Sequence, residues 1–110
     1  MNVGRMKELL ETAMDAIASL SLAELLAKPD DQLFEEHGLP NDPSGYCQIA
    51  VERLERYEDE GVERLDLSVT ASDSRRTIGA IVSVYGDARP GVVGEVVEFC
   101  DGAAVPIRWP

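Results

Sequence analysis

The chain has 110 residues, with 21 acidic and 10 basic side chains and a formal net charge of −11. This length and an apolar content of 45% are typical of one globular domain, which we expect to span residues 1–110. The sequence pI of about 4.3 argues against nucleic acid or an anionic membrane surface as a direct ligand, because phosphate binding needs clustered Lys and Arg.

The acidic residues are concentrated in the first part of the chain. Residues 1–63 hold 15 acids against 5 bases, whereas residues 64–110 hold 6 against 5. The hydrophobic period changes at the same place, from a helical repeat to a strand-like one. We therefore expect a helical layer over about 1–61 to carry nearly all of the negative charge, and a nearly neutral sheet layer over about 62–110.

The N-terminal segment predicts an amphipathic helix. Its apolar residues recur at steps of three and four, which places them on one stripe. They are Met6, Leu9, Leu10, Ala13, Ile17 and Leu20. Charged residues at 7, 8, 11 and 15 interrupt any continuous apolar run, so neither a signal peptide nor a membrane span is predicted, and we expect a soluble cytoplasmic protein.

Two short helices are predicted next. Ser21 and Glu24 form a capping-box pattern at the start of a helix over about residues 22–27, which Pro29 ends. Asp30 and Asp31 then suit the start of a third helix, closed near residues 37–38.

A fourth helix is predicted up to about residue 60. Asp42 and Pro43 are typical of a helix start, and Gly61 is the expected stop. Its apolar stripe would contain Tyr46, Ile49, Ala50, Arg53 or Leu54, and Tyr57.

The rest of the chain predicts four strands. Residues 65–71 alternate between apolar and polar side chains, and residues 77–85 are apolar on both faces, which suggests a central strand. A third strand follows over residues 92–100, and Asp101-Gly102 is a typical two-residue hairpin turn. Pro106 cannot donate a backbone hydrogen bond, so the last strand, which ends near Trp109, should lie at an edge.

The order of these elements predicts an α+β fold, with about four N-terminal helices packed on one face of a C-terminal four-stranded antiparallel meander sheet. The chain shows no internal repeat and no linker that would divide it.

Motifs for chemistry are weak. His37 is the single histidine, so a Ser-His-Asp or Cys-His site would have to use it, for example with Cys47; a helix-end role fits it better. Cys47 and Cys100 form no metal-binding pattern and are expected to be buried reduced thiols. We predict no catalytic residue, no metal and no cofactor, and an enzyme is disfavoured.

The charge instead favours a binding protein. Our first hypothesis is an inhibitor or immunity-type protein that engages another protein with a basic surface through the acidic helical layer. The residues expected to make that contact are Asp30, Asp31, Glu35, Glu36, Glu55, Asp59 and Glu60. Two alternatives stay open: a homodimer joined through the sheet, with Trp109 at the interface, and a ligand-binding or enzyme domain with a pocket between helices and sheet.

Overall fold

The computed structural model describes residues 3–27, 47–73, 75–87, 89–100 and 103–107. Two helices, α1 (Val3–Ala18) and α2 (Leu22–Leu26), precede a six-stranded antiparallel sheet. The strands are β1 (Gln48–Asp59), β2 (Val62–Ser72), β3 (Thr77–Tyr85), β4 (Val92–Val93), β5 (Val97–Cys100) and β6 (Ala103–Pro106). Their order in the sheet is β1-β2-β3-β5-β6, and β4 also pairs with β3.

The two helical predictions at the N-terminus are confirmed. The apolar stripe of α1 is buried against the sheet, apart from Leu20, which follows the helix and is only partly buried. The capping box of α2 is present: the Glu24 backbone N–H donates to the Ser21 hydroxyl at 3.1 Å, and the Ser21 N–H donates to the Glu24 carboxylate at 3.2 Å. The predicted third helix, with Asp30 and Asp31, lies outside the described residues.

The predicted architecture of four helices on a four-stranded sheet is wrong, because residues 48–59 form β1 rather than a helix. Ile49 and Val51 lie opposite Ala71 and Val69 of β2, so their alternation serves the sheet core. The helix-forming Glu, Arg and Leu residues of this segment supply only a weak preference, which strand pairing overrides. The helical layer therefore ends at α2 in the described part of the chain, and the sheet begins at residue 48 instead of about 62.

Gly61 reverses the chain but does not end a helix. Asp59 pairs with Val62, which leaves Glu60 and Gly61 as a two-residue connection between β1 and β2. Their φ angles are 51° and 82°, and positive φ at both positions is typical of the type I′ turn that joins twisted strands. The acidic segment before Gly61 is thus one arm of a hairpin.

The central and last strands were placed correctly. β3 pairs with β2 on one side and with β4 and β5 on the other, whereas β6 lies at an edge. Cys100 pairs with Ala103, as a two-residue connection requires; Asp101 and Gly102 themselves lie outside the described residues.

The predicted third strand is divided by a bulge. Val93 pairs with Val82 and Val97 pairs with Gly79, so three residues, 94–96, lie opposite two residues of β3. The Gly94 N–H remains bonded to the Ile81 carbonyl at 2.9 Å. This irregularity separates β4 from β5.

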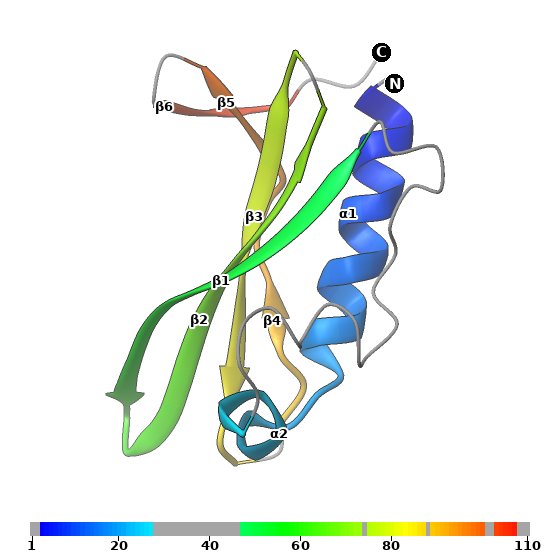
Figure 1. Cartoon of the computed structure of the whole chain (residues 1–110). Coiled ribbons are helices and arrows are strands. Elements are labelled where there is room, and N and C mark those ends of the chain that lie inside the picture. The colour runs from blue at the N-terminus through cyan, green and yellow to red at the C-terminus, as the bar shows by residue number, and fades with distance from the viewer. Residues whose placement is uncertain (1–2, 28–46, 74, 88, 101–102, 108–110) are drawn as a thin grey trace.

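One face of the sheet is covered and the other is open. Helix α1 lies across the covered face (Figure 1), above buried side chains of β2 and β3 that alternate along each strand. These are Leu65, Leu67, Val69, Ala71, Ile78, Ala80, Val82 and Val84. On the open face of β3, Ile81 is 41% exposed, so the apolar second face of this strand contributes less to the core than its sequence indicates.

Candidate functional site

The sequence-predicted contact residues do not form one helical surface. Asp30, Asp31, Glu35 and Glu36 lie outside the described residues, as does Trp109. The other three, Glu55, Asp59 and Glu60, lie in the β1–β2 hairpin and its turn. The expectation of an acidic helical layer is therefore wrong for these three residues.

Some carboxylates of this hairpin form ion pairs with arginine, and others do not. Glu63 pairs with Arg56, and Asp59 pairs with Arg64 at 3.4 Å. Four exposed carboxylates have no ion pair with any described residue, and we call them the acidic hairpin: Glu52, Glu55, Glu58 and Glu60. The turn end of this hairpin lies apart from α1 and α2 (Figure 1).

Like charges also face one another across the hairpin. The register places Glu58 opposite Glu63 and Glu55 opposite Asp66. Directly opposed like charges destabilise a strand pair by a few tenths to about 1 kcal/mol. Arg56 and Arg64 already compensate Glu63 and Asp66, so the charge that a further cation would offset is that of Glu58 and Glu55.

A second polar group occupies the open face of the sheet beside the hairpin. The Arg64 guanidinium donates to Asp66 at 2.9 Å and to the Ser83 hydroxyl at 3.0 Å. The Ser83 hydroxyl in turn donates to the Asp66 carboxylate at 2.8 Å, and the Tyr57 hydroxyl donates to the same carboxylate at 3.2 Å. Arg64 also lies against the rings of Tyr57 and Tyr85, 5.2 and 5.6 Å from the ring centres, where cation–π attraction holds it.

The protonation of this network is fixed by its hydrogen bonds. Burial alone would raise the pKa of the Asp66 carboxyl, but the bonds from Arg64, Ser83 and Tyr57, together with the Arg64 charge, lower this pKa below its usual range. Burial and the bond to Asp66 raise the pKa of the Tyr57 hydroxyl. Asp66 is thus an ionised acceptor with three donors around it, which suits a structural role better than that of a general acid or base. We call Tyr57, Arg64, Asp66 and Ser83 the open-face clasp.

The remaining candidates for chemistry are dispersed. Cys47 is buried, as predicted, whereas Cys100 is exposed at the end of β5, so the prediction for Cys100 is wrong; no disulfide joins them. His37 lies outside the described residues. Within the described ranges, no three His, Cys, Asp or Glu side chains are grouped as a metal site would require.

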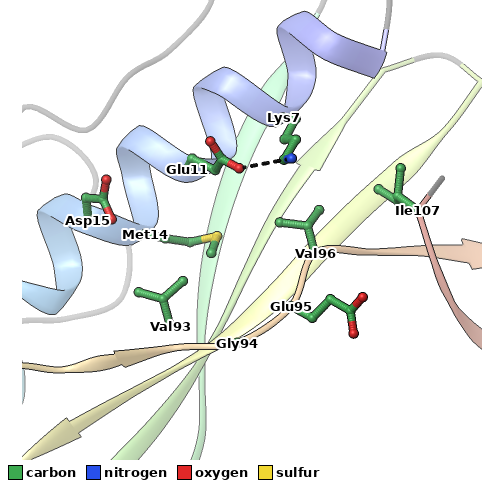
Figure 2. A pocket seen from close by; sticks show the side chains of 9 residues that line it. All are labelled: Lys7, Glu11, Met14, Asp15, Val93, Gly94, Glu95, Val96 and Ile107. Carbon is green, nitrogen blue, oxygen red and sulfur yellow. Dashed lines mark ion pairs between the residues drawn. The ribbon is translucent and has the colours of Figure 1, made fainter. Parts of the chain in front are cut away.

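A pocket of about 500 Å³ opens between α1 and the bulged strand (Figure 2). Four apolar side chains, Met14, Val93, Val96 and Ile107, line it together with Gly94, and four charged residues complete it: Lys7, Glu11, Asp15 and Glu95. We call it the α1–β4 pocket. Its volume lies within the roughly 300–1,000 Å³ of typical ligand sites.

No family model, curated protein or solved structure matches this chain. The acidic hairpin, the polar group on the open face and the α1–β4 pocket are therefore the surfaces from which a function can be proposed. In the described part of the chain, no helix is long and apolar enough to cross a membrane.

Sequence reasoning missed the open-face clasp and the residues that line the pocket. The alternation of Arg64, Asp66 and Ser68 correctly indicates a polar face, but only the β2–β3 register brings Ser83 beside Asp66. The α1–β4 pocket depends on the bulge at residues 94–96. Gly94 within an apolar strand pattern is the one sequence signal that could have indicated it.

Proposed function

We propose that this chain is a small protein-binding module that engages a basic surface of a partner protein through the acidic hairpin. The observation that carries the proposal is the set of four exposed carboxylates without an ion pair in the described structure, on a hairpin whose turn end lies apart from the helices. Asp30, Asp31, Glu35 and Glu36 belong to the proposal as further acids of the same sign.

Electrostatics supports this function in two ways. A one-sided negative field accelerates encounter with a cationic partner, and added salt weakens that effect. A partner cation would also offset the opposed pairs at Glu58 and Glu55. Within this proposal, an inhibitor or immunity-type protein in the cytoplasm is the class that such a surface fits, because blocking a basic site requires charge and shape but no chemistry of its own.

The test compares two variants with the same change of charge. Glu58→Gln/Glu60→Gln removes two charges from the acidic hairpin, and Glu8→Gln/Glu24→Gln removes two from the helices. Gln at residue 24 keeps the capping box. Each protein is immobilised and used to capture basic proteins from native lysate between about 50 and about 500 mM NaCl.

We expect the wild type and the helix variant to capture the same basic protein at low salt and to release it as salt rises. The hairpin variant should capture about fivefold less, because charges at an interface rim mainly change the association rate. Equal capture by both variants, or capture that ignores salt, would show that the acidic hairpin is not the binding surface.

A homodimer joined through the sheet is the second candidate, and the open face favours it. Three large apolar side chains are exposed there: Ile81 (41%), Val92 (54%) and Phe99 (44%). Two chains of charge −11 repel each other, so salt should strengthen a homodimer but weaken a complex with a basic partner. Light scattering across the same salt range separates the two candidates, and a monomer at all salt concentrations excludes the homodimer.

A further inference from the structure

The α1–β4 pocket lies beyond the point where the bulged strand is held close to α1. The Gly91 N–H reaches the Ala18 carbonyl at 3.4 Å, and a Cβ atom at Gly91 would lie 3.0 Å from Ala18. Beyond Val93, Gly94 approaches β3 so closely that its Cβ atom would lie 3.1 Å from the Ile81 carbonyl oxygen. At Gly94 the bulged strand therefore lies against β3, and an open space remains between this strand and α1 (Figure 2).

The inside of this pocket suits an aliphatic chain. Met14 projects from α1 into the space, and Val93 and Val96 face it from the strand (Figure 2). Met14 is almost fully buried, whereas Val93 keeps 38% of its surface exposed. Apolar area therefore remains for an incoming group to cover.

The charge around the pocket favours a cation. Lys7 is neutralised by Glu11, whose carboxylate lies 3.4 Å from the ammonium group. Asp15 and Glu95 are exposed and have no ion pair with any described residue. The pocket lining therefore has a net charge of −2, from three acids and one base.

We propose that the α1–β4 pocket receives a lysine or arginine side chain of the basic partner, with its methylene stem against Val93 and Val96 and its charge at the acidic rim to which Asp15 and Glu95 belong. This inference rests on the proposed function and adds an anchor to it. Small-ligand sites enclose most of their ligand, but this pocket is open, since Glu11 and Val93 remain 49% and 38% exposed. A side chain that projects from a partner protein therefore suits the site better than a free metabolite. Long basic side chains bury their stems in this way while the charged end stays wet.

The test measures the binding of three capped tripeptides, each with a different central residue between two alanines. Binding is monitored through the NMR shifts of the backbone amides of the full-length protein. The central residue is lysine, norleucine, which has the same stem without charge, or diaminopropionic acid, which has the charge on a short stem. We expect the lysine peptide to shift the amides of Gly94, Glu95 and Val96 and to bind about tenfold more tightly than either of the others, because each lacks one of the two contributions. Equal binding of the three peptides, or no shift at these amides, would overturn the inference.

Matched variants locate the effect. Val93→Trp fills the pocket, whereas Val92→Trp places the same bulk on the opposite face of β4. Asp15→Asn/Glu95→Gln removes the pocket charges, and Glu8→Gln/Glu24→Gln is its charge control. Binding of the lysine peptide should fall about tenfold in Val93→Trp and Asp15→Asn/Glu95→Gln and stay unchanged in the controls, with thermal melting showing that all four variants fold.

The titration needs no partner, so the two proposals can fail separately. Peptide binding without hairpin-dependent capture would overturn the proposed function alone. Hairpin-dependent capture without peptide binding would overturn the anchor alone.

Discussion

Replacing Asp66 by Asn tests whether the open-face clasp holds the sheet together. The Asp66 side chain is 15% exposed and its partner Arg64 is 25% exposed, so their attraction is only partly screened. Asn keeps the shape and one acceptor oxygen but loses the charge that strengthens the bonds from Arg64, Ser83 and Tyr57. Hydrogen bonds to a charged group contribute about 1.5–3 kcal/mol each. Since Asn retains part of them, we expect a total loss of about 2 kcal/mol.

The assay is thermal and urea unfolding of Asp66→Asn beside Glu55→Gln. Glu55 lies directly opposite Asp66 on β1, so its neutralisation removes a like-charge repulsion and should be neutral or slightly stabilising. At about 4 °C per kcal/mol for a chain of this size, the Asp66 variant should melt about 8 °C below the wild type. If Asp66→Asn costs no more than Glu55→Gln, the clasp does not stabilise the fold.

The pH dependence gives the same test a second readout. Because the folded state lowers the pKa of Asp66, its contribution is fully present above the unfolded value of about 3.9 and is lost as pH falls through the lower folded value. The difference in unfolding free energy between wild type and Asp66→Asn should therefore be constant above about pH 5 and shrink below about pH 4. A difference that stays constant down to pH 3 would refute the argument that charge is what Asn loses.

Three further substitutions test the backbone and the core by urea unfolding. Glu60→Asn should stabilise the protein by about 0.5–1 kcal/mol relative to Glu60→Gln, since Asn tolerates the positive φ of 51° better; no gain would argue against the type I′ turn. Gly79→Ala should cost about 1–3 kcal/mol, because its Cβ atom would lie 3.0 Å from the Val69 carbonyl oxygen, and a neutral result would show that β2 and β3 can separate there. Leu67→Ala should cost about 2–5 kcal/mol, as expected for a fully buried side chain, and a cost under 1 kcal/mol would place Leu67 outside the core.

The parts of the fold that could be predicted from sequence are the elements that bury a single face, because the spacing of their apolar residues then fits only one type of secondary structure. In α1 the stripe from Met6 to Ile17 fits only a helix, and in β2 the alternation from Leu65 to Ala71 fits only a strand. Residues 48–59 satisfy both periods, since Ile49 is followed by Val51 at a step of two and by Arg53 and Tyr57 at steps of four. Pairing with β2 decides between them, and that pairing is a long-range interaction that local propensity does not contain.

The candidate surfaces were less predictable because they depend on register. Acidic residues near Glu55 and Glu60 are visible in the sequence, but their place in a hairpin becomes clear only once Glu60-Gly61 is recognised as a turn. The open-face clasp needs the β1–β2 and β2–β3 pairings, and the α1–β4 pocket needs a bulge. None of these follows from the composition that first indicated a binding protein.

The distribution of charge along the edges of the sheet also bears on how the two candidate functions relate. β1 is an edge strand, and exposed acids at Glu52, Glu55 and Glu58 keep other strands from pairing with it. The opposite side, at β4 and β6, has mainly apolar exposed residues and only Pro106 to hinder pairing. A second copy would therefore add at β6 or on the open face, away from the exposed acids of β1. A chain that dimerises through the open face can still present an acidic hairpin on each copy.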